Sequence, residues 1–194
     1  MSSLQTVPKK PRLNSAFQRL MSVHWWMASC YLVLFVVGTF MSQMPRNDFR
    51  DILYDFHKSI GVLTMALLTW RILTLLQVVW KKYTKRQPKF SLQWLKNFAL
   101  HTLMYIFMWA VPIAGFLLSN SFRANGVKFF GLVLPDVFPQ DAKMVELGRA
   151  LHFWLSYTFL AFIALHLIVQ WKVAKANWRR LKGFIEARIS TQRN

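Results

Sequence analysis

The chain has 194 residues, which suits one domain, and 55% of them are apolar although the formal net charge is +18. The 25 Lys and Arg residues outnumber the 7 Asp and Glu residues, which argues against a soluble domain with charges of both signs on its surface. Long uncharged apolar runs also argue against a nucleic-acid-binding protein, and the combination is typical of a membrane protein with basic tails and loops.

Four apolar segments follow one another along the chain, at about residues 23–44, 59–80, 98–119 and 150–171. Each is about as long as the 20 residues with which a helix crosses the hydrocarbon core. Lipid offers the backbone no hydrogen-bond partners, so all four should be helices. The sequence therefore predicts an all-α integral membrane four-helix bundle at residues 21–172, between basic tails at residues 1–20 and 173–194.

The basic residues are divided unevenly among the connections. Eighteen of the 25 lie in the N-terminal tail, around the connection between the second and third segments, and in the C-terminal tail. The other two connections hold six of the seven acidic residues. Cytoplasmic loops are enriched in Lys and Arg, so both termini and the middle connection should be cytoplasmic. The stretch 171–189 is then either a basic amphipathic helix on the inner membrane surface or a solvated tail.

The longest connection between two segments covers residues 120–149. Its apolar part, residues 127–135, is too short to cross a membrane and is interrupted by Gly131 and Pro135. We expect it to form an interfacial lid over the outer face.

All five histidines lie in or at the edge of an apolar segment: His24, His57, His101, His152 and His166. An ionisable side chain is costly there and usually serves a function, although a single histidine is often only a hydrogen-bonding group between helices. The predicted topology places two histidines near the outer surface, His57 and His152. The other three open or close their segments near the inner surface.

The spacing of His152 and His166 is the most informative feature. Fourteen residues make about 3.9 helical turns and a rise of about 21 Å, and they return within about 40° of the same face. One helix thus offers a ligand at each of two levels, and the first and second helices can supply the opposite ligands. Haem iron accepts axial imidazoles from two sides, whereas zinc needs three or four converging ligands, so haem is favoured. Because Cys30 is the only cysteine and no C-x-x-C-H motif occurs, the haem should be non-covalent.

Four further residues fit this arrangement. Arg71 lies fourteen residues after His57, where it either bonds to an inner haem propionate or extends to the cytoplasmic interface. Lys58 and Arg149 either serve the outer propionates or are ordinary interfacial charges. Gly61 either lets a porphyrin approach the backbone or serves helix packing.

Several short motifs occur in a recognisable order: Ser22-x-His24-Trp25, His57-x-x-x-Gly61, Arg71, His101-x-x-x-Tyr105, Pro112-x-x-Gly115, and the pair His152 and His166. In these motifs and their positions the chain resembles the bacterial cytochrome b561 family of diheme membrane cytochromes. The resemblance covers nearly all of the apolar region, from about residue 19 to residue 171.

The resemblance implies two non-covalent b haems, held by His24 with His166 at the inner level and by His57 with His152 at the outer level. His101 would then lie beside the ligands or on the quinone side. It further implies a multi-pass protein of the bacterial inner membrane that oxidises or reduces membrane quinone, with superoxide as one candidate donor. The donor is otherwise unknown, and a homodimer is left open.

Two alternatives differ in kind from this reading. One is a b-type subunit that anchors a larger oxidoreductase, such as a hydrogenase or dehydrogenase, in the membrane. The other is a haem-free transporter or proton relay with histidines along a pore, which would be colourless.

Overall fold

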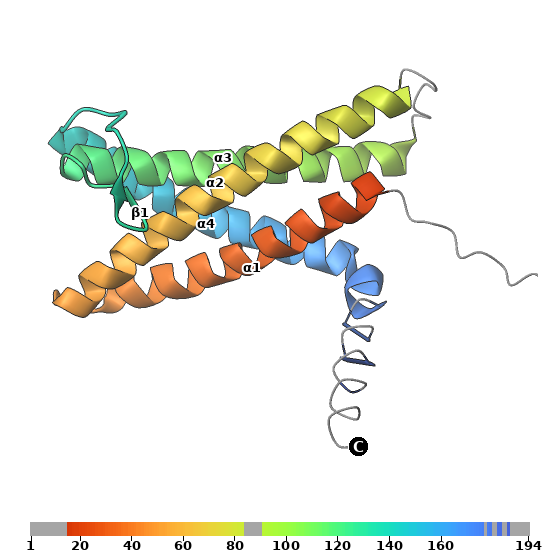
Figure 1. The fold of residues 1–194 in the computed structure, drawn as a ribbon, viewed down its shortest axis with the longest axis horizontal. Coiled ribbons are helices and arrows are strands. Elements are labelled where there is room, and N and C mark those ends of the chain that lie inside the picture. The colour runs from red at the N-terminus through yellow and green to blue at the C-terminus, as the bar shows by residue number, and fades with distance from the viewer. Residues whose placement is uncertain (1–14, 84–90, 177, 180–181, 184–185, 187–194) are drawn as a thin grey trace, which may run out of the picture.

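The computed structural model describes residues 15–83, 91–176, 178–179, 182–183 and 186. They form four long helices, α1 (Ser15–Gln43), α2 (Asp48–Tyr83), α3 (Leu92–Phe122) and α4 (Ala142–Val169), with the short strands β1 (Lys128–Phe129) and β2 (Leu132–Val133) before α4. Figure 1 shows that successive helices run in opposite directions along the length of the molecule. All four are long and apolar enough to cross a membrane, which confirms the predicted all-α membrane bundle.

The helices begin earlier than the apolar segments that predicted them. α2 begins at Asp48 and α4 at Ala142, about two or three turns ahead of their apolar cores. Hydropathy measures only the part that suits hydrocarbon, whereas a helix continues for as long as its backbone is hydrogen-bonded and capped. The Asp141 side chain caps α4 by accepting a bond of 2.9 Å from the Met144 N–H. His57 and His152, which lie in or at the edge of their predicted apolar segments, are therefore nine and ten residues inside α2 and α4.

The alternating helices divide the bundle into two ends. The terminal end holds the start of α1, the α2–α3 connection and the end of α4, whereas the loop end holds the α1–α2 and α3–α4 connections (Figure 1). Beyond a turn at Gln170, residues 171–176 are helical again and take a new direction. Most of the predicted basic segments, at residues 1–14, 84–90 and 187–194, lie outside the described residues.

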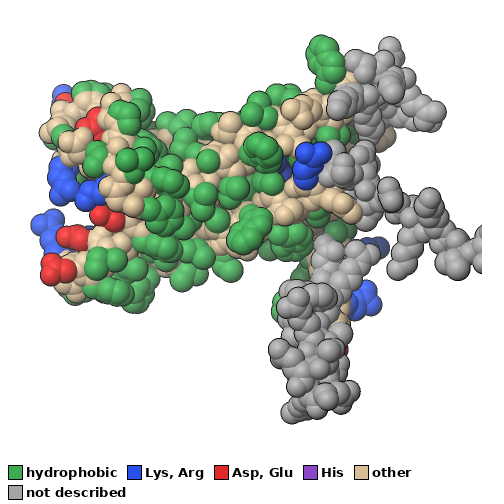
Figure 2. Space-filling view, viewed as in Figure 1, with side chains coloured by type: hydrophobic (Ala, Val, Ile, Leu, Met, Phe, Trp, Pro, Cys, Tyr) green, Lys and Arg blue, Asp and Glu red, His purple; other side chains and the backbone are tan. Residues whose placement is uncertain are grey.

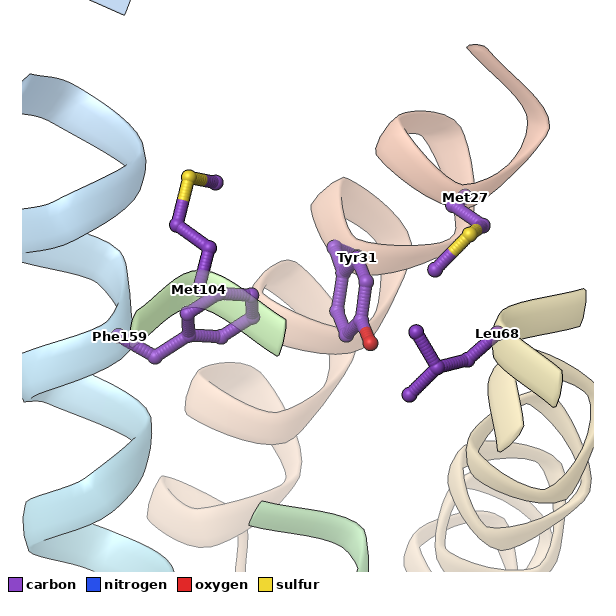
Figure 3. Packing of buried hydrophobic residues seen from close by; sticks show 5 residues of the cluster. All are labelled: Met27, Tyr31, Leu68, Met104 and Phe159. Carbon is purple, nitrogen blue, oxygen red and sulfur yellow. The ribbon is translucent and has the colours of Figure 1, made fainter. Parts of the chain in front are cut away.

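The four helices pack as two pairs, with α1 against α2 and α3 against α4. Only a few large side chains are buried between the pairs, namely Met27, Tyr31, Leu68, Met104 and Phe159 (Figure 3). Most of the large apolar side chains instead cover the outside of the helices. In Figure 2, basic side chains are visible at both ends of the bundle, and acidic ones mainly at the loop end. An apolar outer surface of this kind is the one that lipid covers.

The connection at residues 127–135, predicted as an interfacial lid, is a β-hairpin docked on α2. Lys128 pairs with Val133 and Phe129 with Leu132, around a turn in which Gly131 has a φ of +93°. The buried Ser59 hydroxyl accepts from the Phe130 N–H at 3.0 Å, and its one proton lies between the Asp55 carbonyl at 2.8 Å and the Lys128 carbonyl at 3.1 Å. These bonds fix the loop-end connection to the membrane helix beside it.

Asn120, in the last turn of α3, is fully buried and ties the rest of the connection to the bundle. Its amide nitrogen donates to Asp136 Oδ1 at 2.8 Å, and its amide oxygen accepts from the Val137 N–H at 3.1 Å. Asp136 Oδ2 in turn accepts from the Asn125 N–H at 2.8 Å. One amide side chain thus forms hydrogen bonds with two consecutive residues of the connection.

Replacing Asn120 by alanine should loosen the loop end without unfolding the bundle. Two polar groups lose their buried partner, which costs about 1–3 kcal/mol in free energy of unfolding. Thermal unfolding in detergent and limited proteolysis of the 123–141 connection measure the effect. Gln140→Ala, an exposed change in the same connection, is the control. Equal behaviour of the two variants would show that the Asn120 bonds contribute nothing.

Candidate cofactor site

On all four helices, the five histidines, Arg71 and the residues level with them recur at a spacing of seven. The loop-end level holds Gly38, His57, Gly115 and His152. Seven residues away on every helix lie Tyr31, Thr64, Met108 and Phe159, which form the middle level. Seven residues further lie His24, Arg71, His101 and His166, which form the terminal-end level. Seven residues make nearly two helical turns and a rise of about 10.5 Å, so each helix presents one face at three depths.

At the loop-end level, His57 of α2 faces His152 of α4. Their ring centroids are 6.2 Å apart and the ring planes meet at 83°. His152 Nδ1 lies 2.9 Å from the Val111 carbonyl, and because a carbonyl only accepts, Nδ1 carries the proton. The Nε2 lone pair of His152 is therefore free to bind a metal. His57 Nδ1 is buried without a hydrogen-bond partner.

At the terminal-end level, His166 of α4 lies between two other histidines. Its ring centroid is 6.2 Å from that of His24 and 5.3 Å from that of His101, with interplanar angles of 69° and 88°. His101 Nδ1 donates to the Asn97 carbonyl at 2.6 Å, one turn earlier in its own helix. His166 Nδ1 is buried without a hydrogen-bond partner.

Arg71 joins three helices at this level. Its Nε donates to the Tyr105 hydroxyl on α3, and its Nη1 donates to the Leu20 carbonyl on α1, both at 2.9 Å. Its charge also acts on His24 and His166. Two of the five guanidinium N–H donors are thus used within the protein, on α1 and α3.

The other predicted residues of the site are placed as follows. Lys58 Nζ donates to the Gly126 carbonyl at 2.6 Å, so at least one of its three N–H donors holds the loop-end connection. Arg149 is exposed near the start of α4. A Cβ built on Gly61 would meet no atom within 4 Å, so the backbone there borders open space.

Two glycines that the sequence did not identify as site residues contact the loop-end histidines. A Cβ on Gly38 would come within 3.0 Å of His57 Cε1, and one on Gly115 within 3.2 Å of His152 Cε1. Gly115 stood out only through its motif with Pro112, and Gly38 not at all. The pattern that could have revealed them is their spacing, because Gly38 lies fourteen residues after His24 and Gly115 fourteen after His101.

The middle level is mostly aromatic and apolar, and the hydroxyl of its buried Thr64 donates to the Gly61 carbonyl at 2.7 Å within α2. Tyr31 and Phe159 meet edge to face with centroids 5.1 Å apart, and Phe107 stacks on Phe159 at 6.2 Å (Figure 3 shows the first two). Tyr31 is 7% exposed and Phe159 1% exposed. This layer separates the two histidine levels.

No group of three or more His, Cys, Asp or Glu side chains converges as a metal site within the part of the chain that the structure describes. Each histidine level instead presents rings from different helices that face one another. Histidine imidazole is a common ligand of haem iron.

The family model for prokaryotic cytochrome b561 matches residues 17–180, so the chain belongs to this family. The chain is also 26% identical over 172 residues to cytochrome b561 homolog 2 of Escherichia coli strain K12, with 86% of this chain and 85% of that protein covered. It is therefore a multi-pass bacterial membrane protein that binds b-type haem. It takes part in transmembrane electron transfer and has a quinone-related redox role.

Replacing Tyr105 by phenylalanine tests the bonds that hold Arg71. The guanidinium Nε loses its acceptor on α3, and an interhelical hydrogen bond in a membrane bundle contributes about 0.5–1.5 kcal/mol. We expect a lower Tm in detergent. Tyr157→Phe is the matched control, because the Tyr157 side chain is exposed on α4. An equal Tm for the two variants would contradict a stabilising role for the Arg71–Tyr105 bond.

Proposed function

We propose that the protein is a diheme electron carrier of the bacterial inner membrane. It moves electrons between a donor and the membrane quinone pool through two b haems, each held non-covalently by two histidines. The observation that carries this proposal is that the two candidate ligand pairs have the same ring separation, 6.2 Å, at both levels of the bundle.

This separation suits one metal atom between two rings. A metal–imidazole bond is about 2.0–2.1 Å long and a ring centre lies about 1.1 Å from its nitrogen, so two rings on opposite sides of one metal have centres about 6.2–6.4 Å apart. The pair His57 and His152 and the pair His24 and His166 both match this value. His101 lies closer to His166, at 5.3 Å, which favours His24 as the second ligand at the terminal-end level.

The chemistry of the donor set also suits haem. Neutral imidazole is a standard axial ligand, and a partner on the other ring nitrogen fixes its tautomer. The Val111 carbonyl provides that partner for His152. With two imidazole ligands, a bound haem would have no position left for oxygen. The chemistry that it would supply is one-electron transfer. The histidines hold and orient the group, and the apolar bundle keeps water away from it.

His101 is proposed to orient His166 rather than to bind the metal. Its Nδ1 carries a proton and donates it to the Asn97 carbonyl, so its Nε2 is a hydrogen-bond acceptor. The buried Nδ1 of the adjacent His166 lacks a partner, and a ligand histidine commonly donates from this atom to a neighbouring group. A place on the quinone side of the terminal-end haem is the alternative role for His101.

The charged and small residues of the site complete the proposal. Arg71 has guanidinium donors left for a carboxylate of the terminal-end haem. Lys58 and Arg149 lie toward the loop end, where they can serve the other haem's carboxylates. The open space beside Gly61 suits a porphyrin against the α2 backbone.

The distribution of basic residues supports an orientation. The terminal end carries the basic connection and both tails, so we place it in the cytoplasm and the loop end outside. The diheme bundle then covers residues 21–172 between cytoplasmic tails at 1–20 and 173–194. An electron donor at the outer face, with superoxide as the candidate, rests on the family resemblance, and a homodimer is compatible with this arrangement.

The experiment that tests the function is a dithionite-reduced minus oxidised absorption spectrum of the purified protein, with haem counted per chain. We expect two low-spin b haems. One haem per chain would contradict the two-level site. No haem, in cells supplied with it, would overturn the proposal in favour of a haem-free transporter. A large subunit that copurifies would instead identify a membrane anchor of a larger oxidoreductase.

Single replacements of the histidines by alanine test the pairing. His57→Ala and His152→Ala should each leave only the terminal-end haem, and His24→Ala and His166→Ala only the loop-end haem, since each loses one axial ligand. His101→Ala should retain both, and so serves as the control. Haem content and the low-spin electron paramagnetic resonance (EPR) signals measure the outcome. Loss of the terminal-end haem in His101→Ala but not in His24→Ala would contradict the proposed pair.

A further inference from the structure

Gly38 and Gly115 occupy equivalent places against the two loop-end histidines. Gly38 of α1 lies under the His57 ring, and Gly115 of α3 lies under the His152 ring. A Cβ at Gly38 would be 3.0 Å from Cε1 and 3.5 Å from Nδ1, and one at Gly115 would be 3.2 Å from both atoms. Contacts this short are tighter than ordinary van der Waals contact, so each ring would have to shift by a few tenths of an ångström beside an alanine.

The carbonyl one turn before each glycine faces the same ring. Val111 precedes Gly115 by four residues, and its oxygen accepts the Nδ1 proton of His152 at 2.9 Å. Leu34 precedes Gly38 by four residues, and its carbonyl interacts with His57 without reaching hydrogen-bond geometry. A glycine one turn along the helix leaves this carbonyl open to a neighbouring side chain.

Both rings also have the same orientation in their notch. Nε2 is the farthest of the three nearest ring atoms from the position of the glycine Cβ, at 4.0 Å in both cases. Cε1 and Nδ1 are thus the ring atoms nearest to the glycine, and Nε2 follows them. The two notches belong to different helix pairs, and the planes of the two rings meet at 83°.

We propose that Gly38 and Gly115 are positioning residues for the loop-end histidine pair. Each opens a notch in the neighbouring helix, in which an imidazole packs against the helix backbone, and this contact fixes the plane of the ring. This inference rests on the proposed diheme function, since it assigns the glycines to the loop-end haem. The terminal-end level has no such notch, because the equivalent positions of α1 and α3 are His24 and His101.

The test compares Gly38→Ala and Gly115→Ala with Gly148→Ala in the haem-loaded protein. Gly148 is the matched control, because a Cβ there would come within 2.7 Å of the Leu118 nitrogen and so strain the α3–α4 contact without touching a histidine. The low-spin EPR signal of an iron with two imidazole ligands depends on the angle between their planes. The signal therefore reports the geometry that the notches are proposed to set.

In Gly38→Ala and Gly115→Ala we expect the loop-end EPR signal to be shifted or lost while the terminal-end signal stays at its wild-type position. Gly148→Ala should lower the Tm with both signals at wild-type positions. Unchanged signals in both notch variants would overturn the proposal. So would the simultaneous loss of both haems, or the same loop-end shift in Gly148→Ala, because either would show an effect on the bundle as a whole.

A second measurement does not depend on haem. Alanine is a better helix former than glycine, so Gly115→Ala should raise the Tm once the clashing ring has been removed by His152→Ala, and lower it when His152 is present. A lower Tm in both backgrounds would assign Gly115 to helix packing and overturn the inference. If the wild-type protein held no haem, the proposed function would fail, whereas this Tm comparison would still report on the notch itself.

Discussion

A polar side chain inside a hydrocarbon layer must find its partners within the protein, and the bundle is organised by this requirement. Arg71 is held by a carbonyl of α1 and a hydroxyl of α3, and His152 by a carbonyl of α3. These bonds join helices that otherwise meet through few buried apolar side chains. Because lipid is as apolar as the side chains themselves, such bonds and close packing determine which helices lie together.

The seven-residue spacing brings these polar groups to defined depths. Since seven residues are nearly two helical turns, one face of each helix contributes to three levels. Histidines occupy both end levels, whereas Tyr31 and Phe159 make the middle level apolar. In the proposed function, this arrangement places one haem toward each membrane surface with a dry aromatic layer between them, as transmembrane electron transfer requires. The family membership and the geometry thus point to the same use of the bundle.

The two end levels are supported differently. At the loop end, the imidazoles lie on helix backbone, with glycines beneath them and a carbonyl bound to His152. At the terminal end, side chains surround the pair, since His101 lies against His166 and the Arg71 charge acts on both rings. Neighbouring groups tune the basicity of ligand histidines and the potential of the bound iron. Two haems with the same ligands would therefore have different environments.

The sequence by itself determined the four helices and the shared face of His152 and His166, because hydropathy and helical period are local properties. It also carried the family resemblance, which the comparison confirmed. Only the tertiary structure decided where α2 and α4 begin and that the hairpin docks on Ser59. It also decided how far the His166 ring lies from the rings of His24 and His101. It alone revealed the glycine notches. These features depend on how helices distant in the chain pack together, and no local pattern records the separation between two helices.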